Sequence, residues 1–350
     1  QKLASLCYKK LSMSKKNSNA ILKNNFKNLD TTSDIYLDFK TKLNRFRNKS
    51  FAIAVSGGPD SLALTALSKA YSYEKKKKFH YVLINHRLRK NSSKEAIQVK
   101  KLLKKYKINL NILTNLKLIK KNIQSEARKI RYELLAKFCR KKKVKTILTA
   151  HNLEDQVETF FIRLSRGSGL TGLSAMKPSS EINKKLKLFR PLLNIQKKDL
   201  IQISKKVFGK YFKDPSNKNE KYLRTKIRNL KEPLIKSGIT YDQIIKSINN
   251  LASSKDTLDY YYKKTFKELA KKTKDEITLN LSIFQDLKKE IKIRALNDSI
   301  RLLKNNYYNT RSKKVENLVN KLRGKNFRKS TLGGCIFYVK EDKLCLKIEK

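Results

Sequence analysis

The residues best suited to chemistry are six consecutive ones that follow the apolar run 51–55. Two glycines let a backbone approach an anion closely, and a proline suits the first position of a helix. The free N–H groups at a helix N-terminus, together with the hydroxyls of two serines, favour negative charge. The pattern therefore predicts a buried strand, a phosphate-binding loop and a helix start, formed by Ser56, Gly57, Gly58, Pro59, Asp60 and Ser61.

Asp60 is the unexpected member of this loop, because a carboxylate repels phosphate. A Mg2+ ion that bridges Asp60 to the phosphates would explain it, since Mg2+ is commonly shared between one carboxylate and substrate phosphates. The loop lacks the Gly-Lys-Ser/Thr ending of a Walker A loop and the Gly-x-Gly-x-x-Gly pattern of dinucleotide-binding folds. The structural alternative is an ordinary Gly-Gly-Pro turn between a strand and a helix.

A second group of polar residues lies at His151–Glu158, where His151, Asp155 and Glu158 are spaced i, i+4, i+7 and share one helical face, with Glu154 beside them. Three acids together are costly unless a cation or an amine neutralises them. The alternative is a solvated acidic first turn, which the helix dipole favours anyway.

Three further segments carry arginines or glycines. Each segment could contact a ligand, and each also has a structural interpretation. In the order given below, these are a basic stripe on the surface, a flexible connection, and an ordinary helix after an Asx turn. The residues are Arg128 and Arg131, three apart on one predicted helix; Arg166, Gly167 and Gly169 in a glycine-rich loop; and Arg224 and Arg228, four apart after the turn Asp214–Asn217. His86 follows a predicted strand and could either cap that strand or touch a nucleotide or RNA.

The elements that must position these groups alternate between short apolar runs and helical patterns. Strands are predicted at 51–55, 81–85, 109–113 and 146–150, and helices at about 61–74, 92–106, 123–142 and 152–165. This alternation predicts an α/β fold with a mostly parallel, doubly wound sheet. Ligands bind at the carboxyl ends of such strands. Because three motifs directly follow strands, we expect them on one rim.

The remainder of the chain differs in pattern. Residues 187–193 read as a last strand, 196–325 as helical and Lys-rich, and the tail as a β-hairpin around Lys340–Lys343. The predicted division is a basic N-terminal extension at 1–48, an α/β domain at 49–195, a helical region at 196–325 and a hairpin segment at 326–350. The extension is expected to be frayed, with an organellar transit segment as the alternative.

Composition points to a polyanionic partner. The chain has 84 Lys and Arg against 29 Asp and Glu, a net charge of +55. Nucleic acid fits such a field, although enrichment in Lys, Asn and Ile together also fits a compositional drift. The four cysteines are scattered, which argues against a zinc site, an iron–sulfur cluster or a disulfide framework and fits a reducing compartment. No apolar run is long enough to span a membrane.

Taken in order, the motifs from about 51 to 230 resemble those of the tRNA(Ile)-lysidine synthetase family of PP-loop ATP pyrophosphatases. The shared patterns are Ser-Gly-Gly-x-Asp-Ser, His-x-Leu-Arg, Ala-Arg-x-x-Arg-Tyr, the His151 motif, Arg-Gly-Ser-Gly, Arg-Pro-Leu-Leu and Asp-x-Ser-Asn with a later Arg-x-x-x-Arg. One departure is Glu154, where the family usually has Asp. The resemblance implies an adenine nucleotide alpha hydrolase-like fold with a helical, basic C-terminal domain.

The resemblance also implies an activity. ATP adenylates the wobble cytidine of tRNA-Ile with a CAU anticodon, and the ε-amine of free L-lysine then replaces AMP at carbon 2 to form lysidine. The loop 56–61 would hold ATP, Asp60 would hold Mg2+, and the catalytic residues would be Asp60, Asp155, Glu158 and Arg128. Arg128 and Arg131 would grip the lysine carboxylate or the activated nucleotide. Further substrate contacts would come from His151, Glu154, Arg166, Gly167, Gly169, Arg224 and Arg228.

Partners and alternatives follow from the same resemblance. The basic region after residue 196 is expected to bind tRNA, a homodimer is left open, and no membrane is involved. A bacterial-type cytoplasm is expected, with an organelle matrix or stroma as the alternative. The competing functions are a tRNA thiolase of the same group, a small-molecule amidating ligase and a non-catalytic RNA-binding relative. The scattered cysteines speak against the thiolase, and the presence of Asp60, Ser61 and Asp155 speaks against loss of catalysis.

Overall fold

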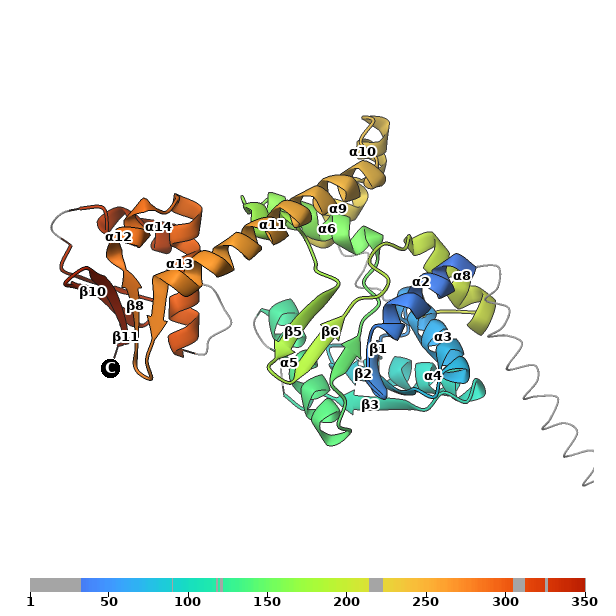
Figure 1. Ribbon diagram of the computed structural model, residues 1–350. Helices are drawn as coiled ribbons and strands as arrows, with labels where there is room; N and C mark the ends of the chain where they lie inside the picture. Colours follow the sequence, from blue (N-terminus) through green and yellow to red (C-terminus); the bar gives the residue numbers. More distant parts are fainter. Residues whose placement is uncertain are drawn as a thin grey trace, which may run out of the picture. The chain divides into compact units, whose positions relative to one another are not determined.

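The computed structural model describes residues 33–89, 91–117, 119, 122–213, 223–304, 312–324 and 327–349 (Figure 1). The chain divides into two compact units, of which the first ends at Ala252 and the second begins at Ser253. The boundaries predicted at residues 48, 195 and 325 stay predictions.

The first unit is built on a six-stranded sheet in the order β3-β2-β1-β4-β6-β5. Five strands are parallel, and the edge strand β5 runs antiparallel to β6. The mostly parallel sheet and its four predicted strands are confirmed. The edge strand was not predicted, because its sequence Ser-Ser-Glu-Ile-Asn is largely polar. The strands are β1 Ser50–Val55, β2 Lys78–Asn85, β3 Leu110–Thr114, β4 Thr146–Leu148, β5 Ser179–Asn183 and β6 Leu186–Phe189.

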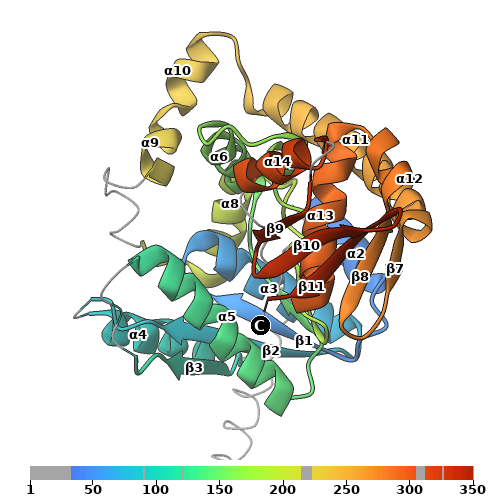
Figure 2. The same ribbon diagram turned by 90° about the vertical axis from the view of Figure 1, so that its left-hand side faces the viewer.

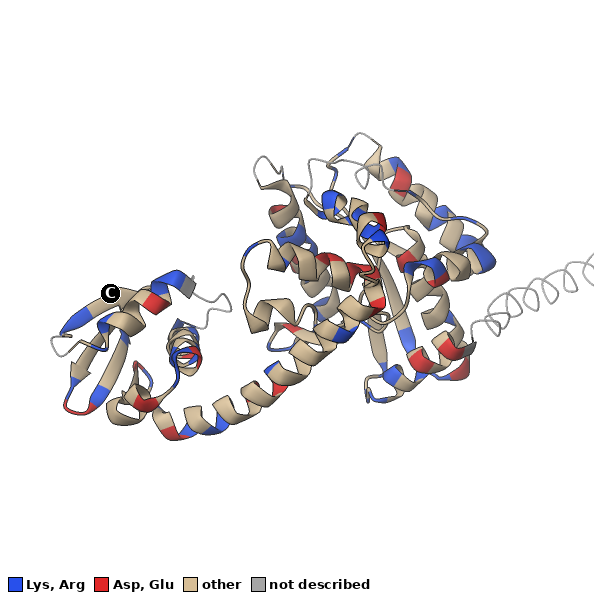
Figure 3. Cartoon of the chain, turned by 90° about the horizontal axis from the view of Figure 1, so that it is seen from above, with Lys and Arg blue, Asp and Glu red and all other residues tan. Residues whose placement is uncertain are grey.

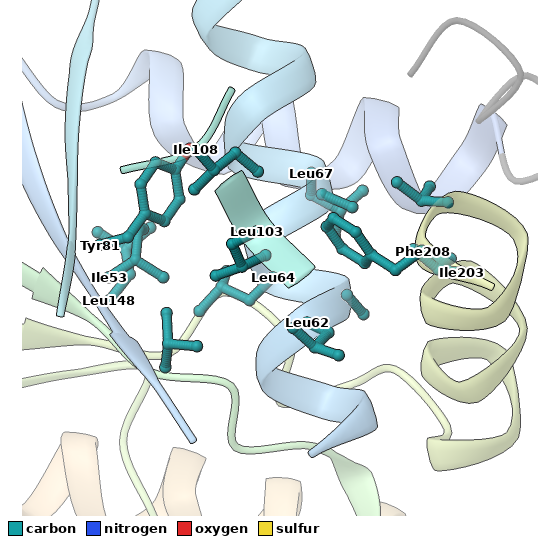
Figure 4. Packing of buried hydrophobic residues seen from close by; sticks show 14 of the residues in the cluster. Ile53, Leu62, Leu64, Leu67, Tyr81, Leu103, Ile108, Leu148, Ile203 and Phe208 are labelled. Atoms are coloured by element: carbon teal, nitrogen blue, oxygen red, sulfur yellow. The ribbon is translucent and has the colours of Figure 1, made fainter. Parts of the chain in front are cut away.

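Helices cover both faces of this sheet (Figure 1). Phe51 and Ile53 of β1 point into a core shared with α2, α3, α4 and α8, whereas Ala52, between them, faces a second core under α5. This alternation follows from the two-residue period of a strand. Figure 4 shows Leu62, Leu64 and Leu67 of α3 within the first core. The helices are α2 Ser33–Asn44, α3 Pro59–Glu74, α4 Ser92–Lys105, α5 Ile123–Lys141 and α8 Lys197–Phe208.

Two of these helices come from segments expected to lie outside the α/β domain. In α2, Phe39 and Leu43 are fully buried, and Phe39 makes an edge-on contact with Tyr71 of α3 at 6.2 Å. In α8, Ile203 and Phe208 are buried against the same core (Figure 4). The α/β core therefore includes both flanking helices.

A smaller apolar cluster supports the helix that carries the acidic motif. Leu153 and Val157 of α6 pack with Ile244 and Ile248 of α11. The remaining helices of this part are α6 Leu153–Leu164, α7 Leu170–Leu173, α9 Leu223–Asn229, α10 Lys231–Lys236 and α11 Tyr241–Leu269.

The second unit contains a five-stranded antiparallel sheet in the order β7-β8-β11-β10-β9, with α13 and α14 against it (Figure 2). The predicted hairpin is confirmed, because Lys340 of β10 pairs with Lys343 of β11. Strands β7 and β8 lie within the region predicted to be helical. The elements are β7 Ala270–Lys272, β8 Glu276–Asn280, α12 Leu281–Asp286, α13 Lys289–Lys304, α14 Ser312–Lys321, β9 Lys329–Leu332, β10 Cys335–Lys340 and β11 Lys343–Ile348.

Lys and Arg residues, coloured blue in Figure 3, are spread along the helices of both units. Such a distribution fits the enrichment of lysine along the whole chain. Among the described helices, none combines the length and apolar character needed to cross a bilayer.

Candidate active site

The predicted motifs meet at the carboxyl ends of the parallel strands. Ser56 follows β1, His86 follows β2, and Arg190 follows β6. His151 lies three residues beyond β4, which pairs with β1 on one side and β6 on the other. The strand order changes direction between β1 and β4, and open α/β sheets bind ligands at such a point. The expected shared rim is confirmed.

The loop after β1 is preformed. Gly57 has φ +87°, and a Cβ atom there would lie 2.6 Å from Val99 Cγ2, so only glycine fits. The Ser61 hydroxyl accepts hydrogen bonds from the amides of Ser56 and Gly57, both at 3.1 Å, and donates to the Gly58 carbonyl at 3.0 Å. Ser61 therefore shapes the loop from inside, with Pro59 as the first residue of α3.

Asp60 carries an unsatisfied carboxylate. Its Oδ1 atom is buried and has no hydrogen-bond partner among the described residues. Burial raises the pKa of Asp60 to about 6; the charge of Lys197 and a hydrogen bond with Asn152 oppose this shift, while Asp155 and Glu154 add to it. A carboxylate held this way would gain from a bound cation.

The start of α6 fixes the acids beside Asp60. Asn152 caps the helix by accepting the Asp155 amide at 2.9 Å, and Asp155 accepts the Asn152 amide at 3.2 Å, which forms a capping box. Glu154 turns the other way and accepts the backbone amide of Lys197 at 2.9 Å. Glu154 thus caps the start of α8, which uses the reach of its additional methylene.

Glu158 is 3% exposed and pairs with the two arginines of α9. Arg224 Nε lies 2.6 Å from Oε2, and Arg228 Nε lies 2.5 Å from Oε1. Arg224 Nη2 also approaches Asp155 Oδ1 at 3.6 Å. The structure thus brings together Asp155, Glu158, Arg224 and Arg228, and burial of Glu158 rules out a solvated turn. The preceding Asp214–Asn217 lies outside the described residues.

The other side of the rim is basic. His151 Nδ1 lies 2.9 Å from Thr149 Oγ1. Burial lowers the pKa of His151 to about 3, and the charges of Arg190, Arg224, Arg128 and Arg131 lower it further in that order. Arg128 stacks over the ring of its neighbour Tyr132, with Cζ 5.0 Å from the centroid.

His86 is also neutral at physiological pH. Burial and the charge of Arg131 lower the pKa of His86 to about 4. Neither ring nitrogen has a hydrogen-bond partner among the described residues. A neutral imidazole with two unpaired nitrogens can both donate to and accept from a ligand.

Not every predicted residue joins this group. Arg166, Gly167 and Gly169 are exposed in the loop before α7, and Arg166 forms no ion pair with a described residue. Conversely, sequence reasoning did not assign Arg190, Asn152 or Lys197 to the site. Arg190 was read as part of the last strand and of the shared Arg-Pro-Leu-Leu pattern but was given no role, although its place before Pro191 at a strand end was a usable signal.

Comparisons with known proteins identify the family of the chain. A PP-loop domain family matches residues 31–234. The tRNA(Ile)-lysidine synthase of Wolbachia pipientis wMel is 35% identical over 295 residues, which cover 83% of this chain and 68% of the relative. The synthase of Rickettsia bellii is 29% identical over 330 residues, or 89% of this chain and 73% of the relative.

Among solved structures, the U34-tRNA thiolase NcsA of Methanococcus maripaludis, with its [4Fe-4S] cluster, matches with a TM-score of 0.54 and 19% identity. That match covers 63% of this chain and 78% of the thiolase, and it shows a common fold only. Domain family and relatives together establish that the chain belongs to the tRNA(Ile)-lysidine synthase family and carries a PP-loop ATP-binding domain.

Proposed function

We propose that this protein joins free L-lysine to carbon 2 of the wobble cytidine in tRNA-Ile with a CAU anticodon, using ATP. The cytidine O2 atom attacks the α-phosphorus of ATP and pyrophosphate leaves. The ε-amine of lysine, after loss of one proton, attacks carbon 2 and gives up a second proton, so that one N–H remains in the product. The bond between carbon 2 and O2 breaks, and AMP leaves with that oxygen as one of its phosphate oxygens. The supporting observation is that a glycine-rich loop at the start of a helix, the carboxylates of Asp60, Asp155 and Glu158, and several arginines lie at one rim in a chain of this family.

The loop after β1 would hold the pyrophosphate part of ATP. The hydroxyl of Ser56 and the backbone of Gly57 and Gly58 line the start of α3, while Pro59 and Ser61 fix the loop. Because the amides of Ser56 and Gly57 are bonded to Ser61, the phosphates would be met chiefly by the N-terminus of α3.

Asp60 fits a Mg2+ ion. Its buried, unpartnered Oδ1 offers the hard oxygen ligand that this ion prefers. Within the described part of the chain, no three His, Cys, Asp or Glu residues form a metal cluster. Water and phosphate oxygens would therefore supply the remaining ligands. When bound, the ion would neutralise charge on the phosphates, and Asp60 would keep its carboxylate ionised for it.

Asp155 and Glu158 would receive the lysine amine in different ways. Both carboxylate oxygens of Glu158 accept hydrogen bonds from arginines, so it holds Arg224 and Arg228 in place. In Asp155, Oδ2 accepts the Asn152 amide, whereas Oδ1 makes a longer 3.6 Å contact with Arg224. We therefore assign the contact with the ammonium group, and the removal of its proton, chiefly to Asp155.

The remaining predicted contacts stay part of the proposal. Arg128 and Arg131 would bind the lysine carboxylate or the activated nucleotide, and His151 would remain neutral among these cations. The exposed loop with Arg166, Gly167 and Gly169 would contact tRNA. Glu154 would act on the site through its cap on α8.

The chain's charge of +55 supports tRNA as the macromolecular substrate, because phosphate contacts supply most of the affinity of such proteins. The target base must be turned out of its strand to reach a pocket. Binding should weaken steeply as salt rises, and a flat response between low and physiological salt would contradict this part. We also propose that the reaction takes place in the cytoplasm. Whether the protein forms a homodimer is tested by analytical sedimentation.

The direct test measures incorporation of labelled lysine into a tRNA-Ile(CAU) transcript with ATP and Mg2+, with tRNA-Met as control. Label should enter only tRNA-Ile, with AMP and pyrophosphate released. Pyrophosphate release without lysine transfer would point to another nucleophile. The described cysteines give a thiolase no support: Cys139 is buried with its pKa raised to about 12, and Cys335 and Cys345 lie in the other unit.

A further inference from the structure

Arg190 is a buried cation whose hydrogen bonds are incomplete. Only 7% of the surface of Arg190 is exposed to solvent. Nη1 donates to the Lys177 carbonyl at 2.8 Å and to Ser180 Oγ at 3.1 Å, whereas Nε is buried without a partner. None of the ion pairs between described residues includes Arg190. A buried charge with no counter-charge is unfavourable, which makes this guanidinium a candidate anion site.

The position of Arg190 connects it to the rim. It directly follows β6, whose Phe189 pairs with Leu148 of β4. The Thr149 amide donates to the Phe189 carbonyl at 3.0 Å, and the Thr149 hydroxyl contacts His151. Arg190 therefore lies beside the residues that lead into α6.

Other charged or polar side chains act on Arg190. Burial lowers the pKa of Arg190, the phenol of Tyr132 opposes this shift, and the charges of Arg128 and Arg163 add to it. Guanidinium groups that influence each other in this way favour a carboxylate or a phosphate, which guanidinium binds with paired hydrogen bonds.

The strand order separates this site from the phosphate loop. The loop follows β1, whereas Arg190 follows β6, with β4 between them. Two strand spacings amount to about 10 Å, too far for one phosphate group to contact both. The acidic pair on α6 follows the intervening strand β4. An occupant whose amine and anion are separated by a chain of methylenes matches this layout.

We propose that Arg190, through its unpartnered Nε and together with Arg128, binds the α-carboxylate of the free amino acid and thereby selects lysine over a simple diamine. This inference rests on the proposed ligation of lysine. It adds a specificity residue to the basic side of the rim, opposite the carboxylates that receive the amine.

The test compares lysine with cadaverine, which is lysine without its carboxylate, as acceptors of adenylated tRNA-Ile. In Arg190→Lys and Arg190→Gln, the KM for lysine should rise about 10- to 100-fold, since a hydrogen bond to a charged group is lost. The KM values for ATP and cadaverine should stay unchanged, so the preference for lysine collapses.

Arg163→Lys is the control, because it keeps the positive charge that acts on Arg190 while changing an arginine with another set of hydrogen bonds. Arg163 donates through Nη1 to the Gly172 and Ala175 carbonyls at 2.6 and 2.7 Å, which is a structural use of the same side chain. It should keep the wild-type preference for lysine over cadaverine. A loss that affects both amines equally in the Arg190 variants would indicate structural damage and overturn the proposal.

Other outcomes are equally decisive. An increase in KM for ATP or tRNA, with the amine preference intact, would assign Arg190 to a phosphate and overturn the inference. A further test uses the wild-type protein with lysine amide, which lacks the negative charge of the carboxylate. If lysine amide were joined to tRNA-Ile as efficiently as lysine, the inference would also be overturned. Failure of the wild-type protein to join any amine to tRNA-Ile would instead refute the proposed function.

Discussion

Asp60 in the first unit and Asp259 in the second are both partly buried carboxylates, yet their surroundings act in opposite directions. Asp259 of α11 is bonded to Lys255 on its own helix and to Arg294 Nη1 of α13 at 2.7 Å. Burial raises the pKa of Asp259, but these two cations outweigh it and the net shift is downward. For Asp60, burial prevails and the pKa rises to about 6.

The two carboxylates differ in whether the protein itself supplies their ionic and hydrogen-bond partners. The chain itself supplies the partners of Asp259, which stabilises the packing of α11 on α13. Asp60 has two other acids nearby and a buried oxygen without a partner. Buried polar groups usually find a hydrogen-bond partner within the protein, and exceptions are expected where a ligand binds. The contrast with Asp259 therefore indicates that the rim is a ligand-binding site.

The largest expected effect concerns activity. Asp60→Ala and Asp155→Ala should each lower lysine incorporation by roughly 100- to 10,000-fold while far-UV circular dichroism stays unchanged, because preorganised charge at the reacting groups is lost. Asp259→Asn, assayed below its melting temperature, should stay within a few-fold of wild type. Near-normal turnover in either of the first two variants would break the comparison.

The next effect concerns stability of the second unit. Asp259→Ala leaves the buried Lys255 ammonium without its counter-charge and removes one partner of Arg294. The free energy of unfolding should fall by about 2–3 kcal/mol, as for a partly buried ion pair that loses one member. Urea denaturation followed by tyrosine fluorescence measures it, with Asp256→Ala on the same helix as control. A change below about 0.5 kcal/mol would be too small for a completed network.

Asp60→Asn should raise the free energy of unfolding, whereas Asp259→Ala lowers it. A carboxyl whose pKa is raised in the folded protein favours folding when protonated and opposes it when ionised, between its ordinary value near 4 and about 6. In Mg2+-free buffer, the variant should be more stable than wild type by about 2 kcal/mol at pH 8 and by almost nothing at pH 4. Denaturation at several pH values tests this, and an equal difference at both ends would contradict it.

The smallest expected effect concerns Glu154, which lies next to Asp155 in the first turn of α6. Glu154→Asp should withdraw the carboxylate from the Lys197 amide and cost about 1 kcal/mol, the usual effect of losing a helix cap. Lysine incorporation should remain within several-fold of wild type, unlike in the adjacent Asp155 variant. A loss of activity comparable to that of Asp155→Ala would place Glu154 in the reaction itself.

Much of the first unit could be predicted from sequence because its signals are local. Buried strands appear as apolar runs, and parallel connectivity forces the residues that follow them onto one rim. Strands β7 and β8 were missed, although Ile277 and Leu279 alternate with polar residues, because lysine-rich flanks mask so short a strand.

The pairing of Glu158 with Arg224 and Arg228 could not be predicted, since 66 and 70 residues separate the partners and only the tertiary fold joins them. Arg190 escaped for a related reason. Its place before Pro191 was visible in the sequence, but its burial and its unpartnered Nε atom, which distinguish it from other arginines, were not.

The core that supports the phosphate loop has a consequence for synthesis. It joins Phe39 of α2 to Phe208 of α8, so it cannot close until nearly 170 further residues have left the ribosome. At about 5–20 residues per second, the nascent chain waits on the order of ten seconds or more with Phe51, Leu62 and their neighbours uncovered. The first half of this enzyme should therefore depend on chaperones more strongly than the locally closed hairpin at its end.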